Sequence, residues 1–256
     1  MSNQLHVALV QSDLFWNDPC GNKSHFDSLL SSVSGADVIV LPEMFTTAFC
    51  LEGSAESING PSVQWMMQKA KSLNAAVSGS LIIQEHSQQY NRFVWVTPNG
   101  EVQYYDKRHL FSLMGEGKLF AAGVDRKIIH YKGWTIFPQI CYDLRFPVFS
   151  RNDLGYDVLL YVANWPARRI MAWDKLLQAR AIENQSYVVG VNRVGEDVNN
   201  ISFPGHSAVY DAFGDTISFL EEEERVEVVT LEKSRLLEAR KNFPFLQDAD
   251  GFTVSK

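Results

Sequence analysis

Three separate segments of the chain carry side chains that suit covalent catalysis, and one of them contains Cys141. This cysteine ends the apolar run 135–140 and precedes a polar stretch, which favours a sulfur exposed on a turn. Backbone N–H groups that follow such a turn can hold an oxyanion. A thiol with a pKa of about 8.5 needs activation before it attacks a carbonyl carbon. The segment alone therefore fits either a nucleophile or a buried packing cysteine.

The other two segments offer a base and a cation. Glu43 follows the short apolar run 37–41, and α/β sheets place ligand-facing residues just beyond such strands, where a carboxylate could act as a general base. Lys107 follows a predicted strand, and an ammonium group beside a thiol and a carboxylate would stabilise an anionic intermediate. Taken singly, a surface acid and a surface lysine are the simpler interpretations. A Cys–His pair that uses His109 lacks a supporting motif.

The composition argues against several other classes of protein. Among 256 residues, 23 Lys and Arg face 30 Asp and Glu, a net charge of −7 with no basic block, so we expect no nucleic-acid partner. The six histidines and three cysteines are dispersed, and neither a G-x-G-x-x-G nor a Walker A motif occurs. We therefore expect no metal and no cofactor.

The chain is also expected to work away from membranes. No apolar stretch approaches the roughly 20 residues of a membrane span, and the first residues lack the pattern of a targeting signal. An odd number of scattered cysteines suits a reducing compartment, so we expect a cytoplasmic protein with free thiols. Cys20 and Cys50 receive no role.

The candidate residues must be positioned by alternating strands and helices. The apolar share of 46% and the lack of a linker or repeat predict one α/β domain over residues 1–256. Apolar runs predict strands at residues 5–11, 37–41, 76–83, 93–97, 102–105, 127–131, 134–140, 158–163, 187–191, 207–210, 216–220 and 225–231. Helical spacing predicts helices at residues 20–33, 62–73, 169–184 and 233–241, the second of them capped by Ser62.

In the order Glu, Lys, Cys, the three segments resemble the signature segments of the nitrilase, or carbon–nitrogen hydrolase, superfamily. They are Leu41-Pro-Glu43-Met, Tyr105-Asp-Lys107-Arg-His-Leu-Phe111 and Ile140-Cys141-Tyr-Asp-Leu-Arg145-Phe-Pro147. The likeness spans nearly the whole chain. It implies that Glu43, Lys107 and Cys141 are catalytic, and it assigns the family's second glutamate to Glu116. It also implies a four-layer αββα sandwich and a homodimer.

Within the superfamily the chain is similar to bacterial omega-amidases, on the segments Asn164-Trp-Pro-Ala-Arg168-Arg169 and Asn192-Arg193-Val-Gly195. This resemblance implies hydrolysis of the terminal amide of a small dicarboxylate monoamide, such as 2-oxoglutaramate or 2-oxosuccinamate, through a Cys141 thioester. The backbone N–H of Tyr142 would help Lys107 to hold the oxyanion.

The small-molecule amide substrate needs a pocket with a charged and an apolar part. Arg168 or Arg169 would meet its free carboxylate, because an unpaired buried charge is costly, although both also fit an exposed helix start. Cationic surroundings of Lys107 would favour a Cys141 thiolate. Four side chains could form the apolar wall, and each also fits core packing: Phe45, Met114, Tyr142 and Trp165.

Three alternative functions remain open. The chain could be an amidase, nitrilase or N-carbamoyl hydrolase of the same superfamily for another small C–N substrate. It could be a non-catalytic scaffold that binds a protein, although the combination of Glu43, Lys107 and Cys141 argues against this. A thiol redox protein is the third alternative, and Cys141 has no resolving cysteine nearby in the sequence.

Overall fold

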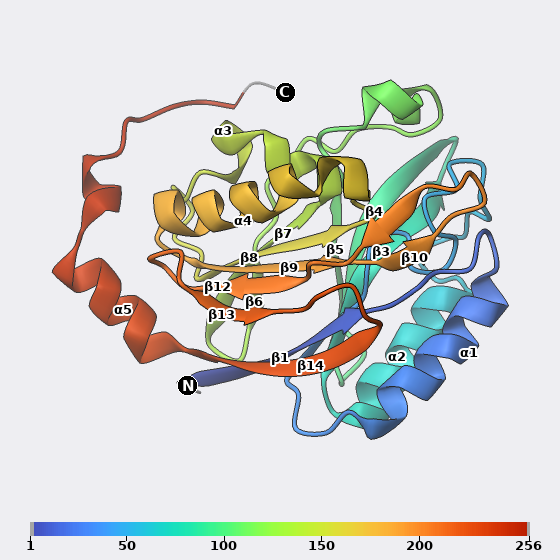
Figure 1. The fold of residues 1–256 in the computed structure, drawn as a ribbon, viewed down its shortest axis with the longest axis horizontal. Coiled ribbons are helices and arrows are strands. Elements are labelled where there is room, and N and C mark those ends of the chain that lie inside the picture. The colour runs from blue at the N-terminus through green and yellow to red at the C-terminus, as the bar shows by residue number, and fades with distance from the viewer. Residues whose placement is uncertain (1–2, 255–256) are drawn as a thin grey trace.

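The computed structural model describes residues 3–254, which form two six-stranded sheets packed face to face. Residues 1–2 and 255–256 lie outside the described residues. The predicted domain over residues 1–256 includes both pairs, and the N-terminal segment predicted to lack a targeting signal includes residues 1–2. Helices cover the outer faces of the sheets, which gives the four layers of an αββα sandwich (Figure 1). The fold class expected from the sequence is confirmed.

The first sheet has the strand order β14-β1-β2-β3-β4-β5. β1, β2 and β3 run parallel, whereas β14, β4 and β5 pair antiparallel with their neighbours. Both faces are buried, since Val7 and Leu9 of β1 belong to the core between the sheets and Ala8 and Val10 to the core beneath the helices. The strands span Gln4–Gln11 (β1), Val38–Val40 (β2), Ala76–Glu85 (β3), Gln88–Val96 (β4), Val102–Asp106 (β5) and Arg225–Glu232 (β14).

The second sheet has the order β13-β12-β9-β8-β7-β6, with β7, β8 and β9 parallel. Every residue of β8 is buried, as its continuous apolar run predicts. A separate two-stranded ribbon consists of β10 (Val194–Glu196) and β11 (Ser202–Pro204). The strands of the sheet span Ile129–Tyr131 (β6), Trp134–Ile140 (β7), Val158–Ala163 (β8), Tyr187–Asn192 (β9), Ala208–Tyr210 (β12) and Thr216–Phe219 (β13).

The helices form the two outer layers. α1 (Pro19–Leu29) and α2 (Pro61–Leu73) lie side by side against the first sheet, and α4 (Ile170–Asn184) lies against the second (Figure 1). α4 approaches β9 closely over Gly190, where a Cβ atom would lie 2.5 Å from Leu177 Cδ1. Two shorter helices are α3 (Pro147–Ser150) and α5 (Lys233–Asn242).

One predicted helix cap is wrong. α2 begins at Pro61, with Gly60 as its N-cap. Proline suits the first helical turn, because an N–H group there has no acceptor within the helix and its absence costs no hydrogen bond. The Ser62 N–H instead donates to the Glu56 carboxylate at 2.8 Å. Among residues 3–254, no helix has the length and apolar character that a membrane span requires.

The strands deliver the candidate residues to the seam between the sheets. Glu43 follows β2 and Lys107 follows β5, both in the first sheet, whereas Cys141 follows β7 in the second. The site is therefore assembled from two sheets that share one core.

Candidate active site

Glu43, Lys107 and Glu116 form a buried ionic cluster. The Lys107 ammonium group donates to Glu43 Oε1 at 2.9 Å and to both carboxylate oxygens of Glu116 at 3.0 Å. Both glutamates are fully buried, and Lys107 is 1% exposed. Since a buried charge without a partner is costly, the three side chains depend on one another. Three of the four residues predicted to be catalytic form this cluster, and the fourth, Cys141, contacts it through Glu43.

The cluster holds more negative than positive charge. Burial by itself lowers the pKa of Lys107, but the carboxylates of Glu116 and Glu43 outweigh burial and raise that pKa above its ordinary value. Lys107 therefore stays an ammonium group at neutral pH. Within residues 3–254, no group of three His, Cys, Asp or Glu side chains is arranged to hold a metal ion.

Cys141 stands at the sharp junction between β7 and the short 3-10 helix η4 (Cys141–Arg145). Its φ of +46° lies in the left-handed region, which residues other than glycine rarely adopt. Burial, and then the charge of Glu43, to which the thiol is also hydrogen-bonded, raise the pKa of Cys141 well above its ordinary value. The resting residue is a thiol. Burial, together with the two carboxylates, outweighs the charge of Lys107, so the cationic neighbour does not by itself give a thiolate.

The turn after β7 is braced by Asp143, a fully buried carboxylate. Its Oδ2 accepts from the Ile140 N–H at 3.0 Å and from the Tyr105 hydroxyl at 2.8 Å. Its Oδ1 accepts from the His109 N–H at 2.9 Å and lies 2.8 Å from His109 Nδ1. Because Tyr105 and His109 flank Lys107, this carboxylate ties the β7 turn to the Lys107 segment. Asp143 carried no predicted role.

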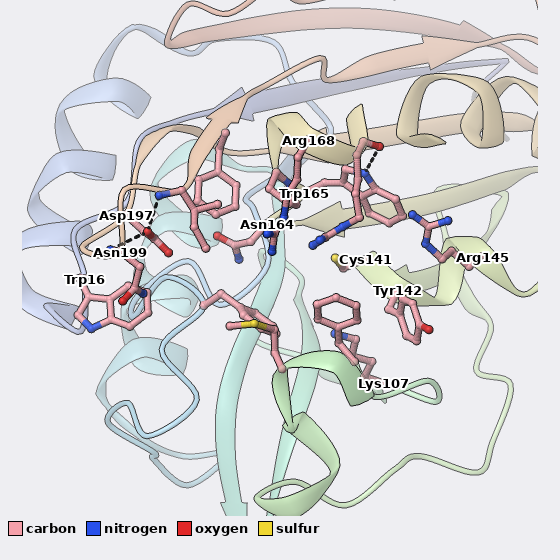
Figure 2. A pocket seen from close by; sticks show the side chains of 17 residues that line it. Trp16, Lys107, Cys141, Tyr142, Arg145, Asn164, Trp165, Arg168, Asp197 and Asn199 are labelled. Carbon is pink, nitrogen blue, oxygen red and sulfur yellow. Dashed lines mark hydrogen bonds between the residues drawn. The ribbon is translucent and has the colours of Figure 1, made fainter. Parts of the chain in front are cut away.

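A pocket has Cys141 and Lys107 in its wall, and Figure 2 shows both side chains at the cavity. Glu43 and Glu116 do not line this pocket, but both contact Lys107, which does. Five of the predicted substrate-binding residues line it: Met114, Tyr142, Trp165, Arg168 and Arg169.

Phe45 is absent from this wall. Its ring is buried among the α1 and α2 side chains, 5.7 Å from the Phe26 ring and 5.9 Å from the Trp65 ring. The reason is the backbone, since Met44 adopts a φ of +45° directly after Glu43 and turns the chain toward the helices. The alternative of core packing holds for this residue.

One end of the pocket is cationic. Arg145, Arg168 and Arg169 all line it, and Arg145 carried no predicted role. The Arg145 guanidinium lies 5.0 Å from the centre of the Trp165 ring, and that of Arg169 lies 5.1 Å from the Phe111 ring. Burial, and then the charge of Arg168, lower the pKa of Arg169. An anionic ligand would relieve the repulsion among these side chains.

Two asparagines that carried no predicted role contact Glu43. Asn164, just after β8, donates its N–H to Glu43 Oε2 at 2.9 Å and its side-chain Nδ2 to the Glu43 carbonyl at 2.7 Å. Asn91, inside β4, donates to Glu43 Oε1 at 2.8 Å. Asn91 lies in the polar first half of β4, before the apolar run 93–96 that predicted the strand, so no local pattern drew attention to it.

Known proteins are similar to this chain in sequence and in fold. The family model described as carbon-nitrogen hydrolase matches residues 6–241. The chain is 47% identical to omega-amidase YafV of Escherichia coli, over 98% of both chains. It is 32% identical to a 2-oxoglutaramate amidase of Bacillus subtilis, over 94% of this chain and 96% of that protein.

A crystal structure gives the same result in three dimensions. XC1258 from Xanthomonas campestris, a CN-hydrolase superfamily protein with an arsenic adduct in its active site, matches with a TM-score of 0.97 and 43% identity. The match covers 99% of this chain and 100% of that one. Sequence, fold and the Glu43–Lys107–Cys141 arrangement agree, and the chain belongs to the carbon-nitrogen hydrolase family of the nitrilase superfamily.

Proposed function

We propose that the protein hydrolyses the terminal amide of a small dicarboxylate monoamide, such as 2-oxoglutaramate or 2-oxosuccinamate, through a Cys141 thioester. The observation that carries the proposal is the contact of Cys141 with Glu43, beside Lys107. Cys141 and Lys107 lie in the wall of a pocket that three arginines also line. The omega-amidase and 2-oxoglutaramate amidase relatives support the substrate class. The family match to residues 6–241 supports one catalytic domain.

In the first half-reaction, Glu43 accepts the thiol proton while the Cys141 sulfur attacks the amide carbon. Lys107 and the backbone N–H of Tyr142 hold the oxyanion, and each donor contributes about 3–4 kcal/mol. Tyr142 lies in the first turn of η4, where N–H groups have no acceptor within the helix. Glu43 then gives the proton to the amide nitrogen, the C–N bond breaks, and ammonia leaves the thioester behind.

In the second half-reaction, a water attacks the thioester carbon and Glu43 takes its proton. The carbon–sulfur bond breaks, the proton passes to Cys141, and the acid leaves a thiol as at the start. Glu116 keeps Lys107 aimed at the oxyanion, because its two oxygens hold the ammonium group at 3.0 Å. Because the resting Cys141 is a thiol, the first half-reaction needs Glu43 as a base, and the second needs it to take the proton of the water.

The substrate's free carboxylate would bind at the cationic end of the pocket. A charge-assisted hydrogen bond contributes roughly 1.5–3 kcal/mol, so loss of one guanidinium should lower kcat/KM about 10- to 150-fold. Single substitutions Arg145→Ala, Arg168→Ala and Arg169→Ala should be compared on glutaramate and on pentanamide, which lacks the carboxylate. A specific loss on glutaramate supports the role, whereas equal losses on both amides would assign the arginines to the fold.

Ammonia release from a substrate panel tests the whole proposal. The panel holds 2-oxoglutaramate, glutaramate, a nitrile and an N-carbamoyl amino acid, and 2-oxoglutaramate is expected to turn over fastest. Cys141→Ala should release no ammonia, and quenched wild-type enzyme should carry the acyl mass on Cys141. Faster turnover of the nitrile or the carbamoyl compound would assign the protein another substrate of its superfamily. Full activity of Cys141→Ala would refute the thioester.

We also propose that the protein forms a homodimer. β13 and β14 are edge strands of the two sheets, and their apolar side chains Ile217, Phe219 and Val228 are 41–42% exposed. Such edges favour pairing with another chain. Light scattering should give twice the 29.0 kDa of one chain. A monomer at micromolar concentration would contradict the proposal.

A further inference from the structure

We infer that Asn91 is a positioning residue that holds the two buried glutamates in place and leaves Glu43 free to accept a proton, an inference that rests on the proposed function. Asn91 lies within β4 and is fully buried. Its Nδ2 donates to Glu43 Oε1 at 2.8 Å and to Glu116 Oε1 at 3.1 Å. The same two oxygens accept from Lys107, so an ammonium group and an amide group both bridge the carboxylates.

The orientation of this amide follows from its partners. Ionised carboxylates can only accept, so the NH2 group must face them and the amide oxygen must face away. There the Ser80 hydroxyl donates to Asn91 Oδ1 at 2.8 Å, while the Ser80 oxygen accepts from the Met44 N–H at 2.8 Å. Met44 follows Glu43, so the hydrogen bonds form a closed ring that begins and ends at Glu43.

Asn91 also positions the third member of the cluster. Its backbone carbonyl accepts from the Lys107 N–H at 3.0 Å, where the chain leaves β5. One residue therefore contacts Glu43, Glu116 and Lys107, through its side chain and its backbone.

The physical need for such a residue comes from the charges. Two carboxylates that share one ammonium group repel each other, because like charges lie close together. A proton on Glu43 would disable the base, since it could not accept the Cys141 proton. One N–H donated to each carboxylate favours the ionised pair. The charged and titratable groups that face Glu43 are Lys107, Glu116 and Cys141.

The test uses Asn91→Asp, which keeps the shape and replaces the donor by an acceptor, and Asn91→Ala. Both should lower kcat/KM for glutaramate about 100-fold. Both should also move the acid limb of the pH profile to higher pH, because a base without these donors takes up a proton more readily. Ser80→Ala leaves the donors in place but frees the amide, so it should give a smaller loss, about tenfold, and a shift in the same direction. This third variant decides the question if the Asn91 variants do not fold.

Asn152→Ala is the matched control. Asn152 is also a buried asparagine, and its side chain makes three hydrogen bonds to the backbone of Tyr156 and Asn184, outside the active site. This variant should lower the melting temperature and leave the acid limb in place. If the Asn91 and Ser80 variants behave in the same way, their role is only structural and the inference is overturned.

A second readout separates this inference from the proposed function. The rate of Cys141 alkylation by iodoacetamide also depends on transfer of the thiol proton to Glu43, and it needs no amide substrate. Wild-type enzyme that releases no ammonia from any amide would refute the proposed function. The acid limb of the pH profile of the alkylation rate would still test Asn91. A shift of this limb in Asn91→Ala would support the inference, and an unchanged limb would refute it.

Discussion

Replacement of Asp143 by Asn should destabilise the fold and displace Cys141, the proposed nucleophile. The carboxylate is fully buried and accepts from two backbone N–H groups, one on each oxygen: that of Ile140 and that of His109. An amide keeps only one accepting oxygen, so whichever way it turns, one of these N–H groups faces an NH2 group. The lost charge-assisted bond and the unsatisfied donor together cost roughly 2–5 kcal/mol. For a chain of this size that lowers the melting temperature by roughly 5–20 °C.

The same change should slow the reaction. Asp143 fixes Ile140, the residue before Cys141, relative to the Lys107 segment, and a displacement of about 1 Å between reacting groups costs about 100-fold in rate. Calorimetry and ammonia release measure the two effects. Asp153→Asn is the control, since Asp153 is 44% exposed in its ion pair with Arg126 and should change stability by less than about 1 kcal/mol. The bracing role would be refuted by a melting temperature within about 2 °C of wild type, which is roughly the resolution of such scans, together with turnover within about twofold of wild type.

Three further changes test other parts of the structure. In Glu43→Gln, burial still raises the pKa of Cys141, so the rate of Cys141 alkylation should rise about tenfold per pH unit across neutral pH. Mass spectrometry measures this rate, and a rate that does not change with pH would contradict the role of Glu43 as the base. Gly190→Ala places a Cβ 2.5 Å from a leucine of α4 and should cost about 1–3 kcal/mol in denaturant unfolding, whereas an unchanged midpoint would show that α4 can shift freely. Burial, and then Asp143, raise the pKa of Tyr105 well above its usual 10.0, so its contribution to stability is full below that pH and is lost as the pH rises through the folded value. Tyr105→Phe should therefore lose less stability than wild type between neutral pH and pH values above about 10, and parallel pH curves would count against this reading.

Local patterns predicted the elements well because periodicity is a local property. The strand predicted at residues 134–140 is β7, and the helix predicted at residues 169–184 begins one residue later as α4. The same logic failed at Phe45, whose closeness to Glu43 in sequence says nothing about the left-handed turn between them.

Some residues of the candidate site could be predicted from the sequence and others could not. Glu43, Lys107 and Cys141 were recognised through a family resemblance, and the structure shows the contacts that join them. Asn91 and Asp143 were not recognised, because their partners lie far away along the chain and depend on the register of β4 against β5 and on the packing of two sheets. Neither relation leaves a periodic trace in the sequence.

The seam between the sheets makes chemical competence a property of the assembled sandwich. With one sheet formed alone, the proposed nucleophile Cys141 would be separated from Glu43, its proposed base, and from Lys107. Any partly unfolded form in which the two sheets are apart therefore lacks the proposed site. The packing that closes the core between the sheets also assembles the candidate active site.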